Sequence, residues 1–280
     1  MMRGMFAAIS GLRAHQTMLD VTANDISNVN TVGYKSERTT FKDALSQTIR
    51  GASSPGASLG GTNPAQVGLG VTLGSIDNLM SAGAIQSTGN TTDMAIQGDG
   101  WFRVTNDPTG FAPANTYYTR AGNFTRDSNG DLVTADGYYV IGNTAPLGAG
   151  TPTKINIPAN ATSFSIDPKG AVTVITPTAT TTTYITLAKF PNEAGLQREG
   201  GNRFSATNNS NNASNPIVVS TPGDAAQGFG SITTGAVEMS NVDLAQEFTN
   251  LITAQRGFQA NSRVISTADD MLQELVNLKH

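Results

Sequence analysis

Few residues in this sequence have the types and spacing that catalysis requires. The chain contains two histidines, His15 and His280, and no cysteine. A Ser-His-Asp arrangement would have to recruit one of these histidines, and no Gly-x-Ser-x-Gly elbow is present. His15 falls within a helical pattern, where a solvent-facing position is expected. The sequence therefore predicts a protein that is not an enzyme.

Two short glycine motifs could suggest a nucleotide cofactor. Gly68-x-Gly70 and Gly98-x-Gly100 both lack the third glycine and the following helix of a dinucleotide-binding fingerprint. They are better interpreted as β-turns or bulges, and no cofactor is expected.

One acidic motif has the spacing that begins a calcium loop. Asp127, Asn129 and Asp131 follow the required pattern, but Tyr138 stands where the closing glutamate belongs. Turn chemistry accounts for these residues better than metal binding does. No metal site is expected.

The composition indicates a polar protein of low charge content with room for about two domains. The 280 residues (29.1 kDa) include 30 glycines, and 14% of them are charged against a usual value of about 25%. The formal net charge is -4 and no basic block is present, so nucleic acid is not an expected partner. Neither a membrane-spanning run nor a cleavable secretory signal is recognisable, so membrane insertion is not expected.

Proline divides the chain into three parts. All 12 prolines lie between Pro55 and Pro222. Because proline inside a helix costs about 3 kcal/mol, this distribution predicts helical ends around a β-rich middle. Asn129-Gly130 and Asp167-Pro168-Lys169-Gly170 are expected hairpin turns, and the runs 178–183 and 207–215 are expected polar loops.

The N-terminal part carries a heptad stripe that predicts a helix from about Arg3 to Val29. A second, shorter helix is expected over Thr40–Arg50, because Phe41, Leu45 and Ile49 would share one face. The stripe consists of Met5, Ile9, Leu12, Gln16, Leu19, Ala23 and Ile26.

The C-terminal part predicts one helix from about Val242 to Leu278, capped by Ser240 or Asn241. At 1.5 Å per residue its length would be roughly 55 Å, too long to be covered by a small domain. The helix must therefore pair with something. Its stripe consists of Leu244, Phe248, Leu251, Gln255, Phe258, Ser262, Ile265, Asp269, Leu272 and Val276.

Two interpretations of the helical ends compete. The first is an intramolecular helical hairpin packed on the β-rich part, which is the more frequent use of an apolar stripe. In the second, the ends pair with each other and with neighbouring copies, becoming fully ordered in an assembly. A head-to-tail contact of that kind does not close and would produce a filament or tube. Either way the expected fold class is α+β, with terminal helices paired as a coiled coil and a central all-β domain.

Three separated motifs resemble the bacterial flagellar rod and hook family. The first lies in 10–35, the second comprises Asp93–Val104 and Tyr118–Phe124, and the third lies in 238–262. Asp25 and Ser27 depart from the first motif, where the family usually has Asn and Ala. The signature positions are Asn24, Asn28, Asn30, Thr31, Gly33, Tyr34, Lys35, Ser240, Asn241, Val242, Gln255 and Arg256.

The resemblance implies an axial structural subunit that polymerises with copies of itself into a hollow tube. Its helices would form the inner coiled-coil layer, over residues 1–66 and 234–280, with the β-rich part, 67–233, outside. Implied partners are rod and hook-filament junction proteins, the hook cap and the flagellar type III export apparatus. The predicted assembly interface is Met5, Ile9, Leu12, Leu19, Ile26, Leu244, Phe248, Leu251, Phe258, Ile265, Leu272 and Val276.

The resemblance also indicates where in the flagellum the subunit would lie. The segments 60–71 and 246–258 resemble the hook protein, so the favoured prediction is an extracellular hook subunit that transmits torque between rod and filament. A distal rod protein of the basal body, in the periplasm, is the alternative, and the short middle of the chain favours it. From another class, an exported β-rich adhesin or carbohydrate-binding protein would use exposed aromatics such as Trp101.

Overall fold

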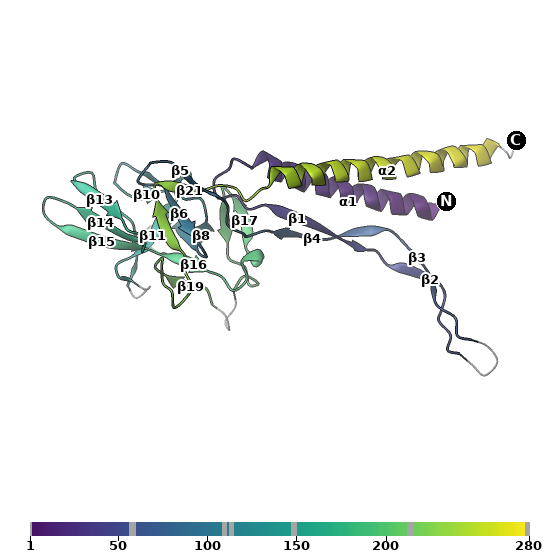
Figure 1. The fold of residues 1–280 in the computed structure, drawn as a ribbon, viewed down its shortest axis with the longest axis horizontal. Helices are drawn as coiled ribbons and strands as arrows, with labels where there is room; N and C mark the ends of the chain where they lie inside the picture. Colours follow the sequence, from purple (N-terminus) through teal and green to yellow (C-terminus); the bar gives the residue numbers. More distant parts are fainter. Residues whose placement is uncertain are drawn as a thin grey trace. The chain divides into compact units, whose positions relative to one another are not determined.

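The computed structural model describes residues 2–55, 60–107, 111, 115–146, 150–211 and 216–277. It has an α+β architecture, with one helix near each end of the chain and a β-rich region between them (Figure 1). The predicted α+β class is confirmed. The chain forms two compact units: a helical unit of Met1–Ser27, Glu37–Asn78 and Asp243–His280, and a β unit of Asn28–Ser36 and Leu79–Val242.

The helical unit contains two antiparallel helices that run side by side (Figure 1). The N-terminal helix agrees with its predicted range, and the C-terminal helix does so as far as the described residues reach, since Leu278 lies outside them. The elements are α1 (Met2–Ser27), β1 (Glu37–Asp43), β2 (Ser46–Arg50), β3 (Ala65–Gly68), β4 (Val71–Asn78) and α2 (Leu244–Asn277).

Three local predictions in this unit are wrong. No helix forms over Thr40–Arg50, because the backbone of this segment pairs in the β1–β4 and β2–β3 ladders, where Phe41 lies opposite Leu73. The cap of α2 is Asp243, whose Oδ1 accepts from the amides of Ala245 (2.9 Å) and Gln246 (3.3 Å). His15 is half-buried and edge-on to Phe41, with a centroid separation of 6.0 Å, so it does not face solvent as predicted.

The β unit is built around one sheet of 13 described strands, whose main order is β13-β14-β15-β11-β7-β8-β18-β17. Two further pairs, β20–β6 and β21–β5, lie outside this sheet. Each joins a strand near the beginning of the β unit's sequence to a strand near its end. Its elements are β5 (Ile85–Ser87), β6 (Met94–Gln97), β7 (Trp101–Thr105), β8 (Thr116–Thr119), β9 (Thr125–Arg126), β10 (Leu132–Val133), β11 (Tyr139–Asn143), β12 (Pro152–Lys154), β13 (Ser163–Ile166), β14 (Ala171–Ile175), β15 (Thr180–Ile185), β16 (Leu187–Lys189), the 3-10 turn η3 (Glu193–Gly195), β17 (Gln197–Gly200), β18 (Arg203–Ser205), β19 (Val218–Ser220), β20 (Ser231–Thr234) and β21 (Ala236–Glu238).

Both predicted hairpins are confirmed. At the first, Asp127 Oδ1 accepts from the amides of Asn129 (2.9 Å) and Asp131 (2.7 Å), and Gly130 takes a φ of 86° that favours glycine. The calcium-like spacing therefore belongs to a turn. The second hairpin joins β13 to β14 through residues 167–170.

One predicted loop is a strand. Residues 180–185 form β15, whose residues 180–184 pair with β14. Threonine is β-branched and favours a pleated, half-buried surface, so the four threonines at 180–183 suit a strand although none of them is apolar. In the run 207–215, residues 207–211 contain no strand and the others lie outside the described residues.

The core of the β unit contains aromatic pairs. Phe102 and Phe124 are fully buried and meet edge to face, with centroids 5.2 Å apart. Trp101, the single tryptophan, is also fully buried and contacts Phe204 at 5.0 Å. Trp101 therefore cannot present its ring to a glycan, as the adhesin interpretation requires.

Replacing Phe124 with Ala should lower the free energy of unfolding of the β unit by about 3–5 kcal/mol, because it removes a buried ring and leaves a cavity. Ile175→Ala, at a position with 46% exposure, should cost less than about 1 kcal/mol. Tryptophan fluorescence during urea unfolding measures both through Trp101. Equal losses in the two variants would contradict this placement of the core.

Candidate functional site

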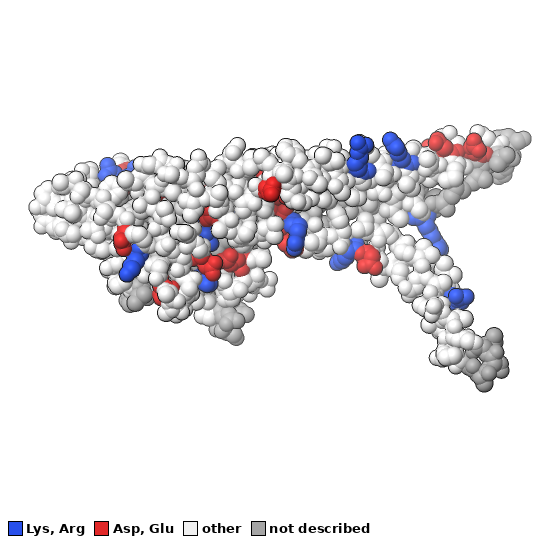
Figure 2. Space-filling model, viewed as in Figure 1, with Lys and Arg blue, Asp and Glu red and all other residues white. Residues whose placement is uncertain are grey.

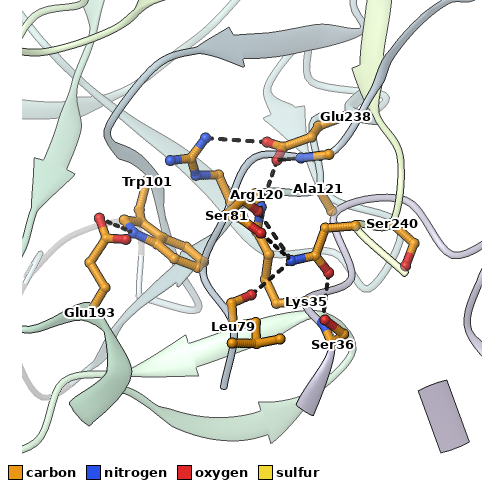
Figure 3. A network of polar contacts seen from close by, with 12 residues as sticks. Lys35, Ser36, Leu79, Ser81, Trp101, Arg120, Ala121, Glu193, Glu238 and Ser240 are labelled. Atoms are coloured by element: carbon orange, nitrogen blue, oxygen red, sulfur yellow. Dashed lines mark hydrogen bonds and ion pairs between the residues drawn. The ribbon is translucent and has the colours of Figure 1, made fainter. Parts of the chain in front are cut away.

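The three motifs of the sequence analysis meet around one buried carboxylate, that of Glu238 at the end of β21 (Figure 3). Its side chain is 1% exposed. Oε1 accepts from Lys35 Nζ at 2.6 Å and from the amide of Gly83 at 2.9 Å, while Oε2 accepts from Arg120 Nη1 at 3.2 Å. Residues that lie far apart in the sequence thus share one ionic centre. We call Lys35, Arg120 and Glu238 the buried network; Ser81, which is exposed, and Asn241, which is half-buried, lie at its edge.

Lys35 contributes one of two cations. Its ammonium group is fully buried and also donates to the carbonyl oxygen of Ser81 at 2.9 Å. Burial lowers the pKa of Lys35, because it removes water from the charged form, and the neighbouring Glu238 carboxylate opposes this shift. The ion pair therefore holds a charge in a position where a lone lysine would be costly.

Arg120 contributes the second cation. Its side chain is 3% exposed, and its guanidinium carbon lies 5.3 Å from the centroid of the Trp101 ring. The aromatic face attracts the cation, and the indole N–H donates to Glu193 at 3.2 Å. Arg120 Nε has no hydrogen-bond partner among the described residues. The geometry fixes the guanidinium between a carboxylate and an aromatic ring.

Asn241 ties the C-terminal motif to the N-terminal motif. Its Oδ1 accepts from the backbone amide of Ser36 at 2.7 Å, and its Nδ2 donates to the carbonyl oxygens of Leu79 (2.8 Å) and Ser81 (3.2 Å). One amide side chain therefore joins its own segment to residue 36 and to the segment 79–81. This role explains why Asn241 is not free to cap α2.

The segment before Lys35 is held just as closely. Gly33 has a φ of 69°, its amide donates to the carbonyl oxygen of Glu238 at 2.7 Å, and a Cβ there would collide with the backbone of Ala121. Arg198 stacks on the Tyr34 ring at 4.8 Å and donates to the carbonyl oxygen of Lys35. Only glycine can occupy position 33 without displacing another segment.

The chemistry of the buried network is structural. Lys35 and Arg120 donate to the same carboxylate, and all three side chains are withdrawn from solvent. Such a cluster offers no exposed nucleophile or base to a substrate. Within the described ranges, no group of three or more acidic or histidine side chains could hold a metal ion, and no helix is long and apolar enough to cross a membrane.

In the helical unit, small residues form the seam between the helices. A Cβ on Gly11 would lie 2.6 Å from Asn261 Nδ2, and Gly257 lies against the His15 ring. Ala254 is fully buried. Small side chains let the helices approach closely, and they leave the large apolar side chains on other faces.

The predicted interface residues consequently divide into two groups. The five on α1 are half-buried, as are Leu251, Ile265 and Leu272 on α2, whereas Leu244, Phe248, Phe258 and Val276 are exposed. Phe6 and Ile252, which the heptad stripe did not include, are also exposed, at 61% and 56%. The helix pair thus leaves a discontinuous set of large apolar side chains uncovered. The half-buried residues of α1 are Met5, Ile9, Leu12, Leu19 and Ile26.

Acidic side chains lie at the opposite end of the helix pair from the chain termini. Asp25 is fully buried and accepts from the amide of Glu37 through both oxygens, at 3.0 and 3.2 Å. Burial raises the pKa of Glu247, and the charges of Asp25 and Asp243 raise it further. Asp25, one of the two departures from the family motif, thus has a specific structural use.

The remaining signature residues serve local structure or face outward. Thr31 Oγ1 donates to Asn28 Oδ1 at 3.0 Å, and Ser240 Oγ accepts from the amide of Val242 at 3.3 Å. The exposed signature residues, all outside the buried network, are Asn24, Asn30, Gln255 and Arg256.

Sequence reasoning did not select Arg120 and Glu238 as site residues. A signal was available, because both are charged residues inside matched motifs of a chain that is only 14% charged. A lysine in one motif and a glutamate in another could have suggested a pair. Spacing alone does not bring positions 35, 120 and 238 together.

Comparison with known proteins gives matches over most of the chain. Residues 5–35 match the family "Flagella basal body rod protein", 95–174 the "Flagellar hook protein FlgE/F/G D1 domain", and 233–278 the "Flagellar basal body rod FlgEFG protein C-terminal". The flagellar basal-body rod protein FlgG of Bacillus subtilis is 49% identical over 282 positions, covering 100% of both chains. The chain belongs to the flagellar rod and hook protein family. It is a structural protein of the bacterial flagellum.

Other members of the family show how the similarity is distributed. The basal-body rod protein FlgG of Agrobacterium fabrum is 41% identical, covering 96% of this chain and 97% of the relative. The hook protein FlgE of Borreliella burgdorferi is 28% identical, and that alignment extends over 454 positions with 100% of both chains covered. The hook relative therefore has long segments without a counterpart here. The comparisons favour the rod alternative over the hook prediction, and they leave no support for an adhesin.

Replacing Glu238 with Gln should lower the free energy of unfolding of the β unit by about 3–5 kcal/mol, because two buried cations lose their anion. Asp99→Asn is the matched control: Asp99 pairs with Lys189 at 2.9 Å but is 64% exposed, so a change below about 1 kcal/mol is expected. Urea unfolding followed by Trp101 fluorescence gives both values. Lys35→Met should lower the free energy of unfolding less when Glu238→Gln is already present than it does in the unchanged protein. Full additivity of the two substitutions would argue against a coupled network.

Gly33→Ala and Gly137→Ala distinguish the cost of backbone strain at positive φ from the cost of a steric collision of the new Cβ atom. Both glycines have positive φ, 69° and 82°, but a Cβ at Gly137 meets nothing within 4 Å. Gly137→Ala should therefore cost about 1 kcal/mol, and Gly33→Ala about 3 kcal/mol or more. Thermal unfolding by circular dichroism distinguishes them, and indistinguishable melting curves would refute the close approach at Gly33.

Proposed function

We propose that this protein is a subunit of the distal rod of the flagellar basal body, which polymerises with copies of itself into an axial tube. The observation that carries the proposal is the full-length similarity to a basal-body rod protein, with 282 aligned positions for 280 residues. The hook relative needs 454 positions to align. The periplasmic rod is the location that this similarity supports.

The helix pair supplies the assembly surface in this proposal. Phe248 and Ile252 are 50% and 56% exposed on α2, and Phe6 is 61% exposed on α1. Covering these large apolar side chains with a neighbouring copy lowers the free energy, because it removes apolar surface from water. The helices then form the coiled-coil inner layer and the β-rich part the outside of the tube, with residues 1–66 and 234–280 as the inner domain and 67–233 as the outer one.

Low charge is a useful property for such a subunit. The visible face of the molecule is mostly free of charged side chains (Figure 2). Neutral polar contacts between neighbours are worth only about 1 kcal/mol each, so a stable tube needs many of them together with the apolar helices. Rod and junction proteins and the export apparatus are the further partners that the family suggests.

Gene deletion separates rod from hook. Loss of a rod subunit should remove the rod end and everything built on it, whereas loss of a hook subunit should leave rods without hooks. Electron microscopy of basal bodies from the deletion strain makes this comparison. Intact distal rods without hooks in the deletion strain would show that the protein is a hook subunit.

Phe248→Asp should raise the protein concentration needed for polymerisation by more than about tenfold, because burying a phenylalanine side chain is worth about 1.5–3 kcal/mol. Ile175→Asp is the control, since Ile175 is similarly exposed, at 46%, but lies on β14. Sedimentation and electron microscopy give the polymer yield. If the Phe248→Asp variant polymerised normally, the helix pair would not be part of the assembly surface.

A further inference from the structure

A groove on the helical unit is the starting point of the inference. It has a volume of about 610 Å³ and runs along α1 beside β4. Phe6, Ile9 and Leu73 contribute apolar walls, and Arg13 contributes the cation. The groove is therefore suited to an amphipathic segment with apolar side chains and at least one carboxylate.

The end of α2 is a segment of that kind. Because Gly11 lies against Asn261 and His15 against Gly257 in the antiparallel pair, Met2 falls opposite Asp270. Residues 271–277, here called the α2 tip, therefore extend past the described part of α1. Met271 is 51% and Val276 63% exposed on this tip.

Charge complements shape at the two places. Asp269, Asp270 and Glu274 lie near the C-terminal end of α2, where the helix dipole is already negative, and the last described turn contains no basic residue. Acidic side chains gather toward this end of α2 on the visible face, while basic ones lie further back along the helices (Figure 2). The carboxylates and the negative end of the helix dipole repel one another. A cation in a groove that received this end of α2 would offset that repulsion, and Arg13 is placed to provide it.

One face of the α2 end is short enough to fit within the groove. Asp269, Leu272 and Val276 share a face, since they are spaced i, i+3 and i+7. They span about 10 Å along the axis, and the groove, from Phe6 to Thr17, spans about 16 Å of α1. The tip of the same chain cannot fill the groove, because it leads away from α1 beyond Met2.

We propose that the α2 tip of one copy docks into the α1–β4 groove of the next copy, with Leu272 and Val276 of the tip in the apolar part and Asp269, two residues before the tip, beside Arg13. The inference rests on the proposed function, because it names the partner as a second copy in the polymer. Tip and groove are different surfaces, so the contact is heterologous and repeats without closing. It thereby specifies a direction of growth.

Cross-linking tests the contact directly. The chain has no cysteine, so Ser10→Cys in one preparation and Val276→Cys in another give single reactive sites in groove and tip. Polymers grown from the mixture and treated with a short bismaleimide should yield a covalent dimer, and a mixture of Ser10→Cys with Ile175→Cys should not. Normal polymers without the Ser10–Val276 dimer would overturn the docking but leave the proposed function intact.

Charge reversal provides an independent readout. Arg13→Glu should reduce polymer yield at least tenfold while the monomer keeps its circular dichroism spectrum, and Asp269→Arg in the same chain should restore most of the yield. Failure of the second change to rescue the first would contradict the Arg13–Asp269 pairing. Failure of the unmodified protein to polymerise, with normal basal bodies in its deletion strain, would instead refute the proposed function and the docking with it.

Discussion

The constraint on which the β unit depends is the satisfaction of one buried carboxylate. Glu238 lies at the end of the last strand, and its two oxygens receive Lys35, Arg120 and the amide of Gly83. None of these groups tolerates burial alone, because each loses its hydration. The strand end, the N-terminal motif and the central motif must therefore arrive at one place together. A buried ion pair of this kind contributes less to net stability than to choosing one arrangement over others.

The helical unit obeys a different constraint, which is close approach. Its seam is lined by small residues, with Ala254 fully buried and Gly11 against Asn261. Large apolar side chains such as Phe248 are therefore turned away from the partner helix. The β unit satisfies its own core, whereas the helical unit has apolar surface left to cover. This difference agrees with the proposal that copies of the protein complete the helical unit, whereas the β unit buries its own core.

The sequence predicted those features that depend on local pattern. Proline placement and heptads located both helices, and Asn129-Gly130 located a hairpin, because turn geometry and helical periodicity are encoded within a few residues. Segment 40–50 was misjudged because Phe41, Leu45 and Ile49 fit a helical face, yet the β1–β4 and β2–β3 ladders decide the conformation. Long-range pairing also turned the threonines of β15 into a strand.

The candidate site was only partly predictable, for a related reason. Lys35 and Asn241 were selected from the family resemblance, but their partners Glu238 and Arg120 were not, because contacts across some 200 residues leave no trace in spacing. The small-residue seam was equally hidden, since a heptad stripe marks large apolar residues and the closest helix contacts are made by glycine and alanine.

The closeness of Gly33 and Glu238 has a consequence for how such chains diversify. The amide of one and the carbonyl oxygen of the other are 2.7 Å apart, so the segments by which the chain enters and leaves the β unit are fastened side by side. Residues 37–78 return to the helical unit, and where the chain re-enters the β unit, the carbonyl oxygen of Leu79 accepts from Asn241 Nδ2 at 2.8 Å. Residues 79–242 therefore behave as an insertion whose ends are already closed. Material can be added to or removed from this segment without altering the helices. Family members can therefore vary the β unit as a module while keeping a common pair of helical ends.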